Sequence, residues 1–373
     1  MKLLHTADWH LGKTLLNHSL IDDQIFILEE FLKLVDDEKP DAIIISGDIY
    51  DRADPSTDAI DLFDDILFKL TEKKLPVLCI AGNHDSSERL NFGSRLFANK
   101  KFFITAKTNS EPETIVLNDD FGEIYFSLIP YLDPIDIKTK FFGENAERLT
   151  FNDANKFYID LARKKIPKNK RSVAVAHVFV EGGEESDSER KFVGTAGKVN
   201  AEIFFDYNYA ALGHLHRPQN IISNKIRYSG SLLKYSAKES THKKGITLVE
   251  IDKNGSVSTK NIELKPKRDL IEVSGTLNNF LSKGIDDSYA YVTLTDDNFV
   301  YDAAQKLREV FPHLMEAKNK SKPKDFIEEP ARKFREGATL SEQFADFFES
   351  MTNRKLTAEE KAAMAEIFAE VQV

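Results

Sequence analysis

Short apolar runs that end in a potential metal ligand recur along this chain and constrain its fold more than any other feature. They are LLHTADWH at 3–10, AIIISGD at 42–48, VLCIAGNHD at 77–85, SVAVAH at 172–177 and YAALGHLH at 209–216. An apolar run of this length, bounded by Gly, Asn or Asp, predicts a buried strand, and open α/β sheets bind ligands just beyond the carboxyl ends of their strands. We therefore expect polar side chains that are far apart in the sequence to meet at one edge.

The segments between these runs carry apolar residues at helical spacing. Residues 22–35 and 59–70 are clear examples. Strands that alternate with helices predict an α/β fold from residue 1 to about residue 217. Residues 221–264 change to short alternating runs with turn residues such as those at 253–255, which predicts antiparallel strands that complete the same domain. The first domain is therefore expected at 1–264.

The C-terminal third predicts several smaller parts. Residues 265–268, Lys-Pro-Lys-Arg, indicate a hinge, and a small α+β domain is expected at 269–317. Residues 318–338 are rich in lysine with little to bury, which is typical of a linker. Residues 339–373 predict two amphipathic helices, the second behind a capping box at Thr357 to Glu360. Two short helices cannot bury their apolar faces alone, so we expect them to pack on the body or on a partner.

Composition limits the class of protein. The formal net charge of −10 argues against a uniformly basic, nucleic-acid-coating surface, although it leaves local basic patches open. No apolar stretch approaches the roughly 18 residues needed to span a bilayer, and Asp8 comes too early for a signal peptide. We therefore expect a cytoplasmic protein without a membrane role. Cys79 is the single cysteine, which excludes an intrachain disulfide, and it is expected to be buried.

The candidate metal ligands share a position at the end of a predicted strand. They are Asp8, His10, Asp48, Asn83, His177, His214 and His216. Carboxylates, imidazoles and an amide without thiolates suit Mn²⁺, Mg²⁺ or Fe²⁺ rather than a closed structural zinc site. The set is too large for one ion but suits two divalent ions bridged by a carboxylate. Two such metals can clamp both oxygens of a phosphoryl displacement and lower the pKa of a bridging water, which predicts hydrolysis of phosphate esters.

The order of these motifs resembles that of the calcineurin-like metallophosphoesterases: DxH, GDxxD, GNHD, a lone histidine after a strand, then GHLH. Longer segments resemble the bacterial SbcD nucleases, relatives of the nuclease subunit of the archaeal and eukaryotic double-strand-break repair complex. These segments are ADWHLGK at 7–13, GDIYDRADPS at 47–56, GNHDSSERLNFGSRLF at 82–97, HVFVEGGEESDSER at 177–190, and ALGHLHRPQ at 211–219 followed by YSGSLLKYSAKE at 228–239. The likeness covers essentially the whole chain. It implies an α/β fold, a two-sheet sandwich flanked by helices, with a small α+β capping domain and a C-terminal helical tail.

The resemblance also assigns roles to single residues. It places Asp8, His10 and His216 on one Mn²⁺, Asn83, His177 and His214 on the other, and Asp48 between them. It implies that His84 acts on the leaving group instead of binding metal, since an imidazole at the rim can give a proton to a departing 3′ oxygen. Asp51 is expected to orient His84 and support its charged form, with Asp85 as the alternative. Archaeal and eukaryotic relatives often carry a histidine where this chain has Asp51.

The activity that the resemblance implies is that of a Mn²⁺-dependent DNA nuclease in repair and recombination. It would be an exonuclease on duplex ends and an endonuclease on hairpins and single strands. The chain has no GxxxxGK[ST] motif, so ATP use must come from another chain, an SbcC-type coiled-coil ATPase that the helical tail is expected to grip. A homodimer through a helical surface and sequence-independent contacts to the DNA backbone are also expected. The alternatives are a small-molecule phosphodiesterase or protein phosphatase on the same bimetal core, or a DNA-end scaffold with incidental hydrolysis.

Other polar residues leave alternatives open. His5 is expected to be a core or supporting residue, and the isolated histidines His18, His242 and His313 are expected at the surface. Several cations are expected either to pair with local acids or to contact DNA phosphates. These are Arg89, Arg95, the basic run at 163–171, Lys238, Lys243 and Lys244.

Overall fold

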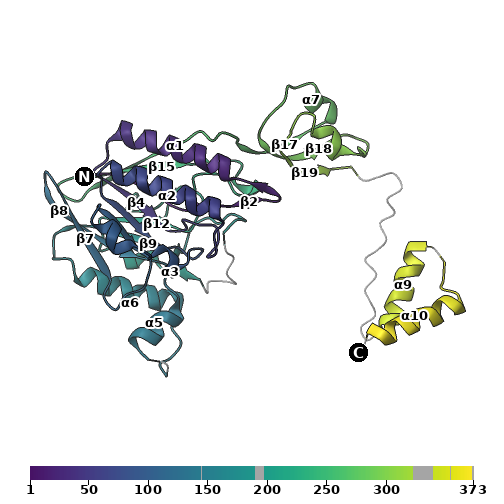
Figure 1. Ribbon diagram of the computed structural model, residues 1–373, viewed down its shortest axis with the longest axis horizontal. Coiled ribbons are helices and arrows are strands. Elements are labelled where there is room, and N and C mark those ends of the chain that lie inside the picture. Colours follow the sequence, from purple (N-terminus) through teal and green to yellow (C-terminus); the bar gives the residue numbers. More distant parts are fainter. Residues whose placement is uncertain (144, 190–196, 322–338, 353, 372–373) are drawn as a thin grey trace. The chain divides into compact units, whose positions relative to one another are not determined.

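The computed structural model describes residues 1–143, 145–189, 197–321, 339–352 and 354–371 (Figure 1). Contacts divide the chain into two compact units, Met1–Ser321 and Lys322–Val373. The first unit contains two six-stranded sheets, flanking helices and a three-stranded sheet, and the second contains helices α9 and α10. Among the described residues, no helix is both long enough and apolar enough to cross a bilayer.

The first six-stranded sheet holds the N-terminal apolar runs. Its order is β16 (Val257–Glu263), β15 (Gly245–Ile251), β1 (Lys2–Thr6), β4 (Ala42–Ser46), β5 (Val77–Ile80) and β6 (Phe102–Thr105). Strands β1, β4, β5 and β6 are parallel, whereas β15 is antiparallel to both β1 and β16. The carboxyl ends of β1, β4 and β5 therefore lie at one edge of the sheet.

The second six-stranded sheet holds the later runs. Its order is β13 (Gln219–Asn220), β14 (Ile226–Tyr228), β12 (Tyr209–Gly213), β9 (Arg171–His177), β8 (Gly122–Ile129) and β7 (Glu113–Asp119). The prediction of antiparallel strands at 221–264 is confirmed for β15 and β16 and only in part for β14, which is antiparallel to β13 but parallel to β12. The reason is that β13 runs antiparallel on the outer side of β14, so the chain returns in the direction of β12.

The two large sheets pack face to face over a shared apolar core that includes Leu3, Ile44, Val173 and Tyr209. Helices α1 (Ile21–Glu38) and α2 (Thr57–Glu72) confirm the periodicity of the sequence and contribute to the core on the outer face of the first sheet. Helices α5 (Pro134–Phe141) and α6 (Phe151–Lys164) do the same for the second sheet (Figure 1). The predicted two-sheet sandwich flanked by helices is thus confirmed, and Cys79 is buried in it.

Short elements connect these layers. They are β2 (Thr14–Leu15), β3 (His18–Ser19), α3 (Ser87–Leu90), α4 (Ser94–Ala98), β10 (Phe179–Val180), β11 (Lys198–Val199) and the 3₁₀ helices η1 (Ala201–Phe204) and η2 (Ala237–Glu239).

A small α+β part of the first unit follows the predicted hinge. It is built from β17 (Leu270–Gly275), α7 (Leu277–Leu281), β18 (Tyr289–Leu294), α8 (Ala303–Leu307) and β19 (Leu314–Asn319), with all three strands parallel. It has its own apolar core, and β19 extends two residues beyond the predicted boundary at 317. Arg268 of the predicted hinge lies 3.2 Å from the buried carboxylate of Asp23 on α1, and the hydroxyl of Tyr289 donates to the same group at 2.7 Å.

The second unit consists of α9 (Leu340–Thr352) and α10 (Ala358–Val371), which meet through Phe344 and Phe368 with ring centroids 5.9 Å apart. The predicted capping box is present, since Glu360 N donates to Thr357 Oγ1 and Thr357 N donates to Glu360 Oε2. Ile367 on α10 keeps 51% of its surface exposed. Residues 322–338, which include most of the predicted linker, lie outside the described residues.

Candidate metal centre

The predicted ligands converge from both large sheets onto one site. Asp8 and His10 follow β1, Asp48 follows β4, Asn83 follows β5, His177 ends β9, and His214 and His216 follow β12. Asn83 is half-buried, and the others are almost fully buried. The sandwich brings the strand ends of its two sheets together, so residues more than two hundred positions apart become neighbours, as predicted from the pattern of strand ends.

The loops that carry these ligands have unusual backbone conformations. Asp8, His10 and Asp48 have φ values of 55°, 47° and 51°, in the left-handed region that costs energy for residues with a side chain. Backbone hydrogen bonds stabilise these strained conformations. Asp8 N donates to Gly47 O and His10 N donates to Asp48 O, both at 3.0 Å. The turns bring these side chains close to His177 and His216 from the second sheet.

Close approach of the two sheets requires glycine at Gly213. A Cβ there would lie 1.9 Å from the carbonyl oxygen of Ser46 on the facing sheet. Gly47, with φ of 87°, is confined in the same way, because a Cβ would lie 2.5 Å from His177 Nδ1. These glycines therefore allow the ligand loops to meet, beyond turning the chain.

One group of ligand atoms surrounds the Asn83 amide oxygen. His177 Nε2 lies 3.1 Å and His214 Nδ1 lies 2.9 Å from Asn83 Oδ1. His177 Nε2 also lies 3.3 Å from Asp48 Oδ2. The other ring nitrogen of His177 lies 2.8 Å from the Ser46 carbonyl and must donate to it, so Nε2 is the nitrogen that can offer a lone pair to a cation once the ring is neutral.

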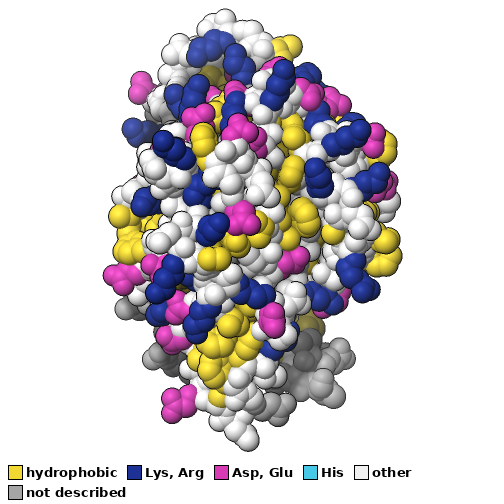
Figure 2. All heavy atoms as spheres, turned by 90° about the vertical axis from the view of Figure 1, so that its left-hand side faces the viewer, with side chains coloured by type: hydrophobic (Ala, Val, Ile, Leu, Met, Phe, Trp, Pro, Cys, Tyr) yellow, Lys and Arg dark blue, Asp and Glu magenta, His cyan; other side chains and the backbone are white. Residues whose placement is uncertain are grey.

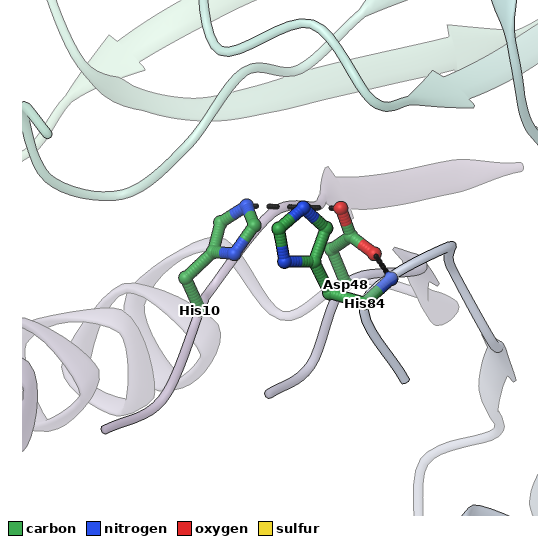
Figure 3. Close-up of side chains that lie close together, drawn as sticks. All are labelled: His10, Asp48 and His84. Carbon is green, nitrogen blue, oxygen red and sulfur yellow. Dashed lines mark hydrogen bonds and ion pairs between the residues drawn. The ribbon is translucent and has the colours of Figure 1, made fainter. Parts of the chain in front are cut away.

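A second group lies on the other side of Asp48. The Nε2 atoms of His10 and His216 are 3.0 Å apart, and His10 Nε2 is 3.7 Å from Asp48 Oδ2. Figure 3 shows the His10 ring pointing toward one oxygen of Asp48, while the backbone nitrogen of His84 is bonded to the other oxygen at 2.9 Å. Asp48 thus contacts both groups.

These separations fit two divalent ions. Two ligand atoms that each lie roughly 2.1 Å from one cation, with a right angle between their bonds to it, are about 3.0 Å apart. Within each group the shortest separations, 2.9 and 3.0 Å, are close to this value, and the separations to Asp48 Oδ2 are longer, at 3.3 and 3.7 Å. Asp48 is also common to the two clusters of potential ligands that the described side chains form, one with Asp8 and His177 and one with His10 and His84. Among the described residues, the buried Oδ2 of Asp8 has no hydrogen-bond partner, as expected for an atom that a cation would satisfy.

Burial and pairing set the charges in the site. Burial lowers the pKa of His10 and of His214 to about 3, so both rings are neutral and keep the lone pair that ligation needs. Burial also opposes charge on Asp48 and His177, but their mutual attraction outweighs it. That attraction holds the pKa of Asp48 well below its usual value and raises the pKa of His177 to about 9. Burial raises the pKa of Asp8 to about 7.

His84 stands half-buried beside the ligands, with its ring centroid 4.7 Å from that of His10. Its Nδ1 lies 2.8 Å from the backbone carbonyl of Asp51 and donates to it, so Nε2 is the nitrogen available for chemistry. The Asp51 carboxylate, expected to orient His84, instead accepts from Lys13 Nζ at 2.6 Å and lies 3.5 Å from His10 Nδ1. Asp51 therefore orients His84 through its backbone.

Asp85, the alternative partner of His84, has a different position. Its carboxylate accepts hydrogen bonds from the backbone nitrogens of Ile49, Tyr50 and Gly82 at 2.8 to 3.1 Å. It thus ties the loop after β4 to the loop after β5.

Sequence reasoning missed a group of side chains that holds His216. The group comprises Ser188, Glu189, Glu239 and Lys244. The signal was weak, because Ser188, Glu189 and Glu239 lie in segments that resemble the family but form no local pattern of their own, and Lys244 lies outside those segments. Lys244, considered as a phosphate contact, is buried and donates to Glu239 Oε2 at 2.6 Å, so that alternative is wrong for this residue.

The other sequence candidates mostly have local partners. His5 is confirmed as a core residue, because its ring nitrogens lie 2.9 Å from Tyr209 Oη and 3.1 Å from Ser46 Oγ. The isolated histidines are half-buried instead of fully at the surface, and the rings of His18 and His313 are 5.9 Å apart. His313 and Tyr289 belong to the small α+β part, and both rings pack against His18 of the body, which shields these two histidines from solvent.

The cations considered for DNA contact also pair locally in several places. Arg89 lies 2.7 Å from Asp54, and Lys238 lies 2.9 Å from Asp187. In the basic run at 163–171, Lys170 pairs with Glu123 and the buried Arg171 pairs with Asp119. On the face drawn in Figure 2, Lys and Arg side chains are interspersed with Asp and Glu and form no continuous basic band. Within the run, these ion pairs give Lys170 and Arg171 a structural role.

Two family models match the chain. Residues 1–218 match the calcineurin-like phosphoesterase model, and residues 266–352 match the model described as the type 5 capsule protein repressor C-terminal domain, SbcD_C. Among solved structures, the chain is similar to the protein TT1561 of Thermus thermophilus, with 15% identity, coverage of 70% of this chain and 98% of that chain, and a TM-score of 0.41. It is also similar to a dimetal phosphatase from Danio rerio, with 13% identity, coverage of 71% and 97%, and a TM-score of 0.39.

A relative supplies the finer match. The SbcD subunit of the SbcCD nuclease of Staphylococcus epidermidis is 34% identical over 325 residues, which are 86% of this chain and 85% of the relative. This match extends well beyond the phosphoesterase model into the C-terminal part. The chain therefore belongs to the calcineurin-like phosphoesterases and, within them, to the SbcD nucleases, which makes it a metal-dependent phosphodiester hydrolase.

Proposed function

We propose that this protein is a Mn²⁺-dependent DNA nuclease of repair and recombination, an exonuclease on duplex ends and an endonuclease on hairpins and single strands. The observation that carries the proposal is the meeting of two ligand groups at Asp48, with His84 beside them. A site for paired divalent ions with a histidine at its rim suits hydrolysis of a phosphodiester.

The residues present fit two ions. Asp8, His10 and His216 would hold one, Asn83, His177 and His214 the other, and Asp48 both. Oxygen and imidazole donors without thiolates favour a site for Mn²⁺ over a closed structural site for zinc. When bound, the ions would supply positive charge at the phosphate and acidify a water molecule.

His84 is proposed to protonate the leaving 3′ oxygen. The Asp51 carbonyl holds its Nδ1–H at 2.8 Å, which fixes the ring and leaves Nε2 as the proton donor when the ring is charged. The bond from His84 N to Asp48 Oδ1 ties this ring to the ligand groups. These two bonds fix the imidazole relative to the ligand groups.

We further propose a homodimer in which α3, α4 and their connection form the contact. Phe92 and Leu96 in this segment expose 85% and 73% of their surface and lie one helical turn apart in the sequence, so together they offer an apolar contact surface. Because the segment directly follows the loop of His84, a dimer here would place two sites on one DNA. Sedimentation of the Leu96→Asp variant tests this, since the proposed dimer would dissociate.

The third proposed partner is an SbcC-type ATPase. The name of the Staphylococcus epidermidis relative describes it as one subunit of a complex, and the tail helices of this chain keep apolar surface exposed at Ile367. A helix pair of this kind suits binding in the groove of another helical protein.

The decisive experiment incubates purified protein and Mn²⁺ with blunt duplex DNA, hairpin DNA, cyclic nucleotides and a phosphoserine peptide, with and without the ATPase. We expect cleavage of both DNA substrates, little turnover of the others, and loss of cleavage after chelation. Turnover of cyclic nucleotides or of the peptide without DNA cleavage would favour the alternative phosphodiesterase or phosphatase.

A further inference from the structure

His216 is fixed at its backbone and at its ring by side chains from separate segments. Its backbone nitrogen donates to Glu189 Oε1 at 2.8 Å, its carbonyl accepts from Lys244 Nζ at 2.6 Å, and its Nδ1 lies 2.7 Å from Ser188 Oγ. These contacts hold the ring with Nε2 facing His10.

The hydroxyl of Ser188 lies between His216 and the carboxylate of Glu239. It donates its proton to Glu239 Oε1, because a carboxylate can only accept. A hydroxyl has one proton, so toward His216 the same oxygen must accept, and Nδ1 of His216 must carry hydrogen. This arrangement selects the tautomer with a lone pair on Nε2, which is the atom that lies 3.0 Å from His10 Nε2.

Glu239 is fully buried at the end of η2, where an unpaired charge would be costly. Lys244 Nζ donates to its Oε2 at 2.6 Å, and Ser236 Oγ donates to its Oε1 at 3.2 Å. Lys244 in turn donates to Ser231 Oγ at 2.8 Å, so the ion pair is well satisfied. The carboxylate is therefore kept negative and in place next to the ligand loop.

We propose that Glu239, acting through Ser188, is a positioning residue that holds His216 in its Nδ1–H tautomer and thereby sets the affinity of the cation site formed with His10. The proposal rests on the metal site of the proposed function but not on DNA cleavage. Glu239 would support a metal ligand without touching the metal, unlike Asp8 and Asp48, which are expected to bind it directly.

The test measures Mn²⁺ binding to the full-length, metal-free protein by calorimetry. Ser188→Ala breaks the relay without stranding a buried charge. We expect one of the two dissociation constants to rise about 10- to 100-fold while the other changes less than about twofold. The paired variant Glu239→Gln with Lys244→Met, which removes both buried charges together, should shift the same site. Nitrogen NMR of labelled histidines should show loss of the Nδ1–H form of His216 in Ser188→Ala.

The matched control is Ser236→Ala, which removes a hydroxyl from the same Glu239 oxygen but leaves Ser188 in place. It should leave both constants unchanged. Unchanged constants and an unchanged His216 tautomer in Ser188→Ala would overturn the proposal, as would an equal loss of affinity in Ser236→Ala. If the wild-type protein binds two Mn²⁺ ions but cuts no DNA, the proposed function fails while this inference stands.

Discussion

The carboxylate of Asp48 lies 3.3 Å from Nε2 of His177, and the two buried groups stabilise each other's charge. This pairing keeps a proton on the very nitrogen that would bind a cation. Metal binding and proton binding therefore compete at His177.

Mn²⁺ binding should consequently release a proton. The pKa of His177 is raised to about 9, so at pH 8 the ring is mostly charged in the metal-free protein, while Asp8, with a pKa near 7, is mostly ionised. We expect release of about one proton at pH 8 and an affinity that rises with pH until about pH 9. Below pH 7, Asp8 adds a second proton to the exchange. Calorimetry in buffers of different ionisation enthalpy measures the number, and an identical apparent enthalpy in every buffer would contradict it.

Asp48→Asn should weaken both cation sites at once. The amide keeps the shape of the side chain but removes the charge that contacts both ligand groups, so we expect both Mn²⁺ dissociation constants to rise more than about 100-fold and cleavage to be lost. The exposed Asp64→Asn on α2 is the matched control and should behave like the wild type. Retention of one unchanged site in Asp48→Asn would show that Asp48 serves only a single ion.

His84→Gln should separate chemistry from metal binding. The ring is proposed to give a proton to the leaving oxygen and is not a ligand, so cleavage should fall about 10²- to 10⁴-fold while Mn²⁺ affinity stays the same. His313→Gln, at a histidine that lies 3.2 Å from Asp287 in the small α+β part, serves as the control. Loss of a bound Mn²⁺ ion in His84→Gln would instead make His84 a ligand.

The same variant tests the scaffold alternative in cells. If His84→Gln lacks cleavage but fully supports repair, the protein acts there as a DNA-end scaffold. Failure of repair would agree with the nuclease.

Asp23→Asn should loosen the small α+β part from the body. Asp23 is buried and receives contacts from Arg268, the last residue of the predicted hinge, and from Tyr289, which lies beyond the hinge. Arg268 has two carboxylate partners, the buried Asp23 and the exposed Asp287, and the variant removes the charge of the buried one. We therefore expect the opening free energy of β17 to fall by about 2 kcal/mol. Hydrogen exchange of the β17 amides measures this change, with the neighbouring exposed Asp22→Asn as control. Equal protection in both variants would rule out a latch at Asp23.

How far the sequence could lead depends on the range of the contacts involved. Asp48 and His177 were predictable, because each follows an apolar run whose strand character is local, and parallel strands share an edge. The partners of His216 were not, because Glu239 and Lys244 reach it from segments with no recurring pattern. Asp51 shows the same limit on a smaller scale, since its sequence position indicated a carboxylate partner for His84 while the turn presents its backbone carbonyl instead.

Strand direction was predictable only in part, for the same reason. The alternating run at Gly245–Ile251 and its neighbour Val257–Glu263 are joined by a short turn, and adjacent strands joined in this way pair antiparallel. The run at Ile226–Tyr228 has the same local pattern but pairs with Tyr209–Gly213 across a longer excursion, and its direction depends on that path.

Ile367→Asp should disrupt partner binding while leaving the nuclease site intact. Ile367 lies on α10 in the compact unit Lys322–Val373 and exposes about half its surface, whereas every predicted ligand belongs to Met1–Ser321. A charge at an apolar contact should lower the affinity for the SbcC-type ATPase at least about tenfold, and Mn²⁺-dependent cleavage by the protein alone should be unchanged. Ala362→Asp, at another exposed position of α10, separates a specific contact from the general effect of added charge. Co-purification of Ile367→Asp with the ATPase at wild-type yield would show that the tail binds through another face.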